Sequence, residues 1–137
     1  MAAVATLSAA LKNPHTRDKD RIFAQLGDLM SRADDFDPMP YQSEIVECRY
    51  DIYRGVWNDV LHLRTSGNLL ALGKNIRCPV VAIHGDYDPH PAEGVKTPLS
   101  GVLADFTFIL LRNCGHRPWV EREAKDEFFR ILERQLD

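Results

Sequence analysis

Two short apolar runs of this chain, residues 79–84 and 106–111, lead directly into polar side chains that could transfer protons. The second run is followed by His116. The first run ends in a set of alternating imidazoles and carboxylates: His84, Asp86, Asp88 and His90. A carboxylate that holds one imidazole nitrogen fixes the tautomer of the ring and leaves the other nitrogen to act as a base. Asp88 and His116 would form such a pair if the fold brings the two loops together.

The same residues also suit structural roles. Asp86 and Asp88 flank a turn-like sequence, and Asp is favoured in turns because its side chain accepts local hydrogen bonds. His116 follows Gly115 and would also suit a surface position that flanks a helix. Cys114, at the end of the second run, fits a small buried residue better than a nucleophile.

A metal site is an alternative interpretation of the first loop. In an extended chain, four alternating side chains would point to one side: His84, Asp86, Asp88 and His90. Imidazole and carboxylate are both competent ligands of divalent metals. The glycine and prolines interspersed among these residues disfavour a straight strand, which weakens this interpretation.

The elements that would position these loops form a βαβα pattern. The two apolar runs are rich in β-branched or aromatic residues and are typical of strands buried on both faces of a parallel sheet. Residues 92–104 are long enough for the crossover helix that parallel strands require. A last helix is predicted from Pro118 at its first turn, with Glu121 and Glu123 in that turn. Both loops would then leave the carboxyl edge of the sheet, about 4.8 Å apart.

The chain before residue 76 has helical periodicity instead. Helices are predicted over residues 18–34, from an N-cap at Ser43 to Gly67, and over 69–72. The sequence Asp-Pro-Met-Pro at 37–40 separates the first two helices. We therefore expect two segments, a helical one at 1–75 and a βαβα one at 76–137.

Composition excludes several classes of function. The 137 residues carry a formal net charge of −3, which does not favour a nucleic-acid partner. No apolar run approaches the roughly 20 residues that span a bilayer, and the apolar residues 1–11 lack the preceding positive charge of a secretory signal. The three cysteines, Cys48, Cys78 and Cys114, are widely spaced, as expected of reduced thiols. These features predict a cytoplasmic protein that does not bind membranes.

The sequences CPVVAIHGDYD at 78–88 and CGHRPWVE at 114–121 together resemble the C-terminal part of α/β-hydrolase fold enzymes. In that superfamily an apolar strand leads to the acid of a catalytic triad, and the next strand leads to a Gly-His whose histidine is the base. The resemblance implies that Asp88 is the triad acid and His116 the general base. It also implies that residues 1–75 are a lid, in which residues around Trp57 would line a substrate pocket.

The expected fold is thus α/β, the C-terminal part of an α/β-hydrolase, mostly helical with a short two-stranded parallel sheet. The resemblance implies hydrolysis of a small ester, thioester or amide without a cofactor. The nucleophile elbow, G-x-S-x-G, is missing from the sequence, because none of the five serines has the required glycines: Ser8, Ser31, Ser43, Ser66 and Ser100. Loss of a triad nucleophile costs on the order of 10⁶ in rate, so the isolated chain is expected to be nearly inert.

Three origins would explain such a chain: a truncation, one half of a split gene, or a degenerate homologue that serves as a non-catalytic interaction module. A two-stranded parallel sheet does not bury itself, since such sheets occur with several strands and with helices on both faces. We therefore expect self-association, or pairing with a nucleophile-bearing half, through an open sheet edge.

Overall fold

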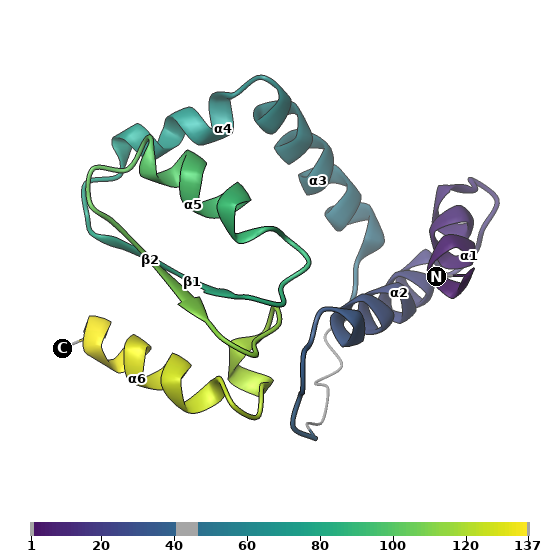
Figure 1. The fold of residues 1–137 in the computed structure, drawn as a ribbon. Coiled ribbons are helices and arrows are strands. Elements are labelled where there is room, and N and C mark those ends of the chain that lie inside the picture. The colour runs from purple at the N-terminus through teal and green to yellow at the C-terminus, as the bar shows by residue number, and fades with distance from the viewer. Residues whose placement is uncertain (1, 41–46, 137) are drawn as a thin grey trace. The chain divides into compact units, whose positions relative to one another are not determined.

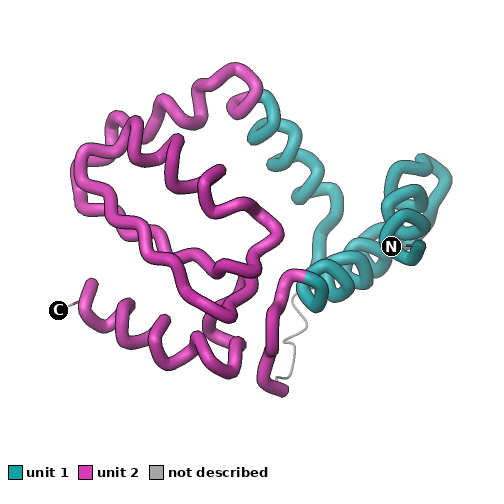
Figure 2. The backbone as a smooth tube through the Cα atoms, viewed as in Figure 1, with its two compact units in different colours: residues 1–33, 42–62 teal, residues 34–41, 63–137 magenta. Residues whose placement is uncertain are grey.

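The structure is a computed structural model that describes residues 2–40 and 47–136. The chain forms two compact units (Figure 2). The first unit consists of residues 1–33 and 42–62, and the second of residues 34–41 and 63–137. Residues 34–41 and 63–75 thus group with the two strands in the second unit.

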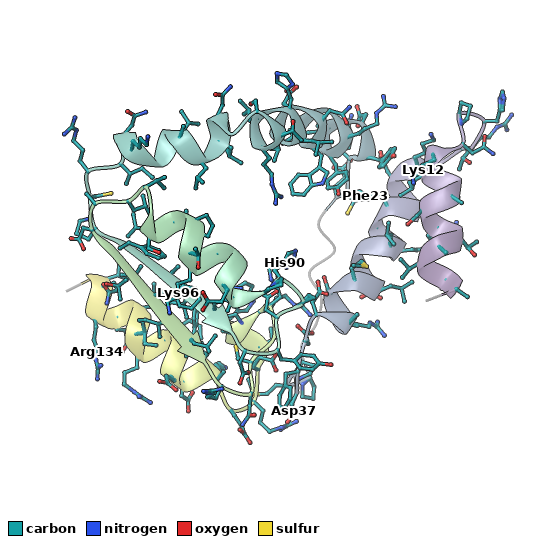
Figure 3. All side chains as sticks on the ribbon, turned by 45° about the horizontal axis from the view of Figure 1, so that its top comes forward. Lys12, Phe23, Asp37, His90, Lys96 and Arg134 are labelled. Carbon is teal, nitrogen blue, oxygen red and sulfur yellow. The ribbon has the colours of Figure 1, made fainter. Side chains whose placement is uncertain are left out.

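The first unit contains helices α1 (Ala2–Lys12), α2 (Lys19–Ala33) and the greater part of α3 (Tyr50–Thr65). α1 packs against α2, and the Lys19 ammonium donates a hydrogen bond to the carbonyl of Leu11 at 2.8 Å. An aromatic cluster joins α2 to α3, in which the Phe23 ring lies 4.4 Å from that of Tyr53. Figure 3 shows Phe23 on α2.

The start of α3 corrects the sequence prediction. Residues 47–49 are not helical and the helix begins at Tyr50, whereas the predicted N-cap, Ser43, lies outside the described residues. The reason is a long-range cap. The carboxylate of Asp20, on α2, accepts a hydrogen bond from the backbone N–H of Tyr50 at 2.8 Å. It therefore satisfies one of the free amides at the helix start, which a local Ser would otherwise have done.

The second unit is built on two parallel strands, β1 (Val80–Gly85) and β2 (Phe106–Leu111), paired from Val80↔Phe106 to Gly85↔Leu111. Helix α5 (Ala92–Ser100) makes the crossover between them. A short helix α4 (Asn68–Ala71) and a 3₁₀ turn η1 (Leu72–Asn75) precede β1. The prediction of a mostly helical α/β chain with a short two-stranded parallel sheet is confirmed for the described residues.

Helices α5 and α6 (Lys125–Leu136) lie on opposite faces of the two strands (Figure 1). The face toward α6 carries the buried core: Leu111, Cys114, Ala124 and Ile131, with Ile83, Ile109 and Phe128 packed against it. On the other face, the Lys96 ammonium of α5 lies 6.0 Å from the ring centre of Phe108.

The last helix begins later than predicted. Pro118 starts only a 3₁₀ turn, η2 (Pro118–Val120), and the chain is extended at Glu121 before α6 begins at Lys125. Glu121 and Glu123 therefore lie outside the first helical turn. In the described part of the chain, no helix has the length and apolarity needed to cross a membrane.

Candidate active site

The loops that follow β1 and β2 are joined by backbone hydrogen bonds. The N–H of Asp86 donates to the carbonyl of Leu111, and that of Tyr87 to the carbonyl of Cys114, both at 2.9 Å. Gly85, the last residue of β1, permits this approach, because a Cβ there would collide with the backbone of Cys114 and Gly115. These hydrogen bonds hold the ends of β1 and β2 side by side.

This contact brings Asp88 and His116 together. The ring Nδ1 of His116 lies 2.7 Å from Oδ2 of Asp88, across 28 residues of sequence. The Asp88 side chain is 6% exposed and that of His116 is 51% exposed. A ring that donates Nδ1–H to Asp88 has its Nε2 lone pair available for a proton from a neighbouring group.

Asp88 also interacts with two other imidazoles. Its Oδ1 accepts a hydrogen bond from the backbone N–H of His90 at 2.8 Å and lies 2.9 Å from Nδ1 of the same residue. Nε2 of the buried His84 lies 3.7 Å from Oδ2 of Asp88. Burial by itself would raise the pKa of Asp88, but the hydrogen bonds from His90 and His116 outweigh it and hold the pKa below its ordinary value.

The His116 loop is fixed by residues 34–37, where the sequence predicted only the end of a helix (18–34) and the start of a break (37–40). The backbone N–H of His116 donates to the carbonyl of Asp34 at 2.8 Å. The neighbouring Arg117 makes two hydrogen bonds to the carboxylate of Asp35, of 2.9 and 2.5 Å. The Asp35 side chain is 1% exposed. This bidentate ion pair ties the His116 loop to residues 34–37, whereas Asp88 contacts the same loop from the end of β1.

Glu121 completes this support. It is fully buried, and its carboxylate accepts hydrogen bonds from the backbone N–H groups of Phe36 (2.7 Å), Asp37 (2.8 Å) and Gly115 (2.8 Å). A Cβ on Gly115 would collide with Asp34 and with the Glu121 carboxylate. Glu121 was expected in a helical first turn. It is instead drawn into the interior, because three buried amides need an acceptor there.

Sequence reasoning missed Asp35 and the role of Glu121. The partners of Glu121 at Phe36 and Asp37 lie 85 and 84 residues away, and Arg117 lies 82 residues from Asp35. Local periodicity carries no information at such separations. The three aspartates among residues 34–37 were assigned only to the end of the predicted helix and to the break that follows it.

The four side chains of the alternative metal interpretation, His84, Asp86, Asp88 and His90, do not all point to one side. Asp86 turns toward the other loop, where its carboxylate lies 3.3 Å from the N–H of Cys114 and 3.6 Å from Arg112. The reason is the turn at residues 86–88, which replaces the straight strand that the alternation would need. The described residues instead bring together the ligand atoms of Asp88, His90 and His116, all within 4.8 Å of one another.

The predicted buried role of Cys114 is confirmed. The residue has no exposed surface, and burial, with the nearby carboxylates of Glu121, Asp86 and Asp88, raises the pKa of its thiol to about 12. Cys48 and Cys78 are free thiols as well.

Trp57 and Trp119 are each about half-exposed. The Trp119 ring lies 6.0 Å from that of Phe128, and Trp57 stacks on Tyr53 within the first unit.

An open cavity of about 380 Å³ adjoins the Asp88–His116 pair. The described residues that line this cavity are Arg64, Ile83, His84, Gly85, Asp88, His90, Val95, His116 and Pro118. Among these described lining residues there is no serine, threonine or cysteine. Arg64 also borders a second cavity, about 620 Å³ and largely apolar, that includes Leu69, Leu99 and Leu103 in its walls.

Comparison with known protein families, with curated proteins and with solved structures finds no match to this chain.

Proposed function

We propose that this chain carries the acid and base of a serine-type α/β-hydrolase, with Asp88 as the acid and His116 as the base. The observation that supports this most is the 2.7 Å contact between Nδ1 of His116 and Oδ2 of Asp88. It joins the ends of two neighbouring parallel strands, the edge at which α/β proteins place their sites. The low pKa of Asp88 also fits the role, because the acid must stay ionised.

The proposed reaction is acyl transfer to a hydroxyl nucleophile and then to water. Nε2 of His116 takes the proton of the nucleophile as its oxygen bonds to the substrate carbonyl carbon. His116 then returns this proton to the leaving alcohol, thiol or amine as the bond to it breaks. Water attacks the acyl-enzyme by the same route and restores the nucleophile. Throughout, Asp88 orients His116 and stabilises its charged form.

The substrate is proposed to be a small acyl compound such as an ester, thioester or amide. The cavity beside His116, about 380 Å³, lies at the lower end of the range for small-molecule sites. Apolar wall atoms from Ile83 and Val95 suit an acyl group. The chemistry requires no cofactor.

The nucleophile is proposed to come from another polypeptide segment, in a G-x-S-x-G elbow that this sequence lacks. The absence of a hydroxyl or thiol from the described lining of the cavity supports this. The same absence also favours a second candidate, a non-catalytic interaction module that keeps the pair as a structural contact. The two candidates differ in whether a complex of this chain reacts with serine-hydrolase reagents.

The test is labelling by a fluorophosphonate probe of the chain purified natively from its own cells, together with any polypeptide that accompanies it. We expect one labelled serine within a G-x-S-x-G sequence, with labelling slowed by about 10⁴-fold in Asp88→Asn and by more in His116→Ala. The exposed His15→Ala is the matched control and should label at the wild-type rate. The recombinant chain alone should remain unlabelled.

Labelling that survives His116→Ala would overturn the proposal, and so would labelling of any of the five serines of this chain by itself. A native preparation that never labels would favour the interaction module.

A further inference from the structure

Three side chains at the strand ends form a cluster that the acid–base pair does not explain. His90 projects from the loop between β1 and α5 (Figure 3), and its ring centre lies 5.3 Å from that of His116. Both imidazoles present Nδ1 to the same carboxylate, at 2.9 Å from Oδ1 and 2.7 Å from Oδ2 of Asp88. A triad needs only one of these imidazoles, so His90 adds a third donor atom beyond the needs of proton transfer.

The donor set is one that zinc prefers. Imidazole nitrogen binds Zn²⁺ at about 2.0–2.1 Å and carboxylate oxygen at about 2.0–2.2 Å, and tetrahedral geometry then separates ligand atoms by roughly 3.3 Å. The donor atoms of Asp88, His90 and His116 already lie within 4.8 Å of one another. The two imidazoles are 69% and 51% exposed, so their rings have room for the small rotations that bring them to this spacing.

We propose that Asp88, His90 and His116 form a site for a divalent transition metal, of which Zn²⁺ fits best. Three protein ligands leave the fourth tetrahedral position to water, as in open zinc sites. Binding would displace each Nδ1 proton that now lies between a ring and the carboxylate, and in a neutral imidazole that proton moves to Nε2. A metal on Nδ1 of His116 would also take this nitrogen away from Asp88, so the ion would inhibit the hydrolase. That consequence, unlike the binding, rests on the proposed function.

His84 would support the site without being a ligand. It is buried, its Nδ1 lies 2.8 Å from the carbonyl of Gly85, and its Nε2 lies 3.7 Å from Oδ2 of Asp88. This places it beside the ligating carboxylate, where a second layer of contacts commonly orients a metal ligand.

The binding test is a titration of the purified chain with Zn²⁺ against a chromogenic zinc indicator, in a Cys48→Ser, Cys78→Ser background that removes the accessible thiols. We expect one equivalent to bind, with the affinity lowered more than about tenfold in each of His90→Ala, His116→Ala and Asp88→Asn. His15→Ala is the matched control, because it removes an exposed imidazole from the first unit. It should leave the affinity unchanged. The visible spectrum with Co²⁺ should show a tetrahedral site without thiolate ligands.

Equal affinities in the wild type and in His90→Ala would overturn the site, as would a loss of binding in His15→Ala. Because the titration uses no substrate and no probe, its failure would leave the hydrolase proposal intact. Conversely, a chain that binds zinc but never forms a labelled complex would retain the metal site and lose the hydrolase function. If both proposals hold, zinc should slow fluorophosphonate labelling of the native complex, and less so in His90→Ala, each relative to its own zinc-free rate.

Discussion

The two compact units differ in how they are held together. The second unit contains nearly all the buried apolar side chains of the described residues: Leu103, Leu111, Cys114, Val120, Ala124 and Ile131. It also contains their buried polar side chains, Asp35, His84 and Glu121. In the described part of the first unit, Leu11 is the one apolar side chain that is buried to the same degree. Contacts between its helices include one partly buried hydrogen bond, one exposed hydrogen bond and aromatic contacts.

This contrast shows two ways in which segments of a chain are held in place. Helices joined by partly exposed side chains lose little when one contact is removed, because water replaces the partner. Loops held by a buried carboxylate lose far more, because the amides that it served are left without an acceptor. The candidate site lies entirely in the second kind of structure. We therefore expect large effects from changes at the strand ends and small ones from changes in the first unit.

The largest difference is predicted for the thiols. Cys114 is buried with a pKa of about 12, whereas Cys48, in the first unit, is partly accessible. Near pH 8 a pKa of 12 leaves about 10⁻⁴ of the thiol ionised, roughly 10³-fold less than for a thiol of ordinary pKa. In a titration with Ellman's reagent, Cys48 and the exposed Cys78 should react rapidly and Cys114 only after unfolding. Rapid reaction of all three thiols in the folded protein would contradict the burial of Cys114.

The next largest effect is expected from Glu121→Ala. The substitution leaves three backbone N–H groups without their acceptor, those of Phe36, Asp37 and Gly115, at a cost of about 3 kcal/mol or more in the free energy of unfolding. Urea denaturation measures this cost. The exposed Glu133→Ala is the matched control and should change stability by less than about 0.5 kcal/mol. A loss below about 1 kcal/mol in Glu121→Ala would show that the carboxylate does not hold the loop.

The sequence predicted those parts of the second unit that depend on local pattern and sheet geometry. The two strands follow from their apolar runs, and the meeting of Asp88 with His116 follows from the common edge of parallel strands. In the first unit, α2 (Lys19–Ala33) agrees with its predicted range to within one residue at each end. In each case the determining residues are close in sequence or belong to neighbouring strands.

The two helix starts that were predicted wrongly, those of α3 and α6, each depend on a polar contact between distant residues. α3 begins at Tyr50 because Asp20 caps it, and α6 begins after Glu121 because the amides at 36–37 draw that carboxylate inward. A single sequence contains no signal that couples such positions. The supporting contacts of Asp35 and Glu121 therefore could not be predicted from the sequence, whereas the roles of Asp88 and His116 could.

Gly115→Ala tests how tightly the supporting contacts are packed. A Cβ there would collide with the backbone of Asp34 and with the Glu121 carboxylate, so we expect a loss of about 1–3 kcal/mol. Gly94→Ala, in α5, is the matched control, because a Cβ there meets nothing within 4 Å. It should stabilise by about 0.5–1 kcal/mol through helix propensity. Equal thermal denaturation curves for the two variants would mean that the His116 loop tolerates displacement from residues 34–37.

The smallest effect concerns the stability that Asp88 contributes, and its sign follows from the direction of the pKa shift. The folded pKa of Asp88 lies below the ordinary value of 3.8, so the ionised carboxylate stabilises the fold at pH values above 3.8. This contribution is lost as the pH falls through the lower folded pKa. We expect Asp88→Asn to cost about 1 kcal/mol at pH 7, and the difference from wild type to shrink toward zero in acid.

Urea denaturation of both proteins from pH 7 into the acid range measures this difference. The exposed Asp105→Asn is the matched control, and its difference from wild type should stay within about 0.5 kcal/mol at every pH. A difference for Asp88→Asn that grows as the pH falls would require a folded pKa above 3.8. Desolvation would then outweigh the hydrogen bonds from His90 and His116, and Asp88 would be a buried acid instead of the ionised partner of an imidazole.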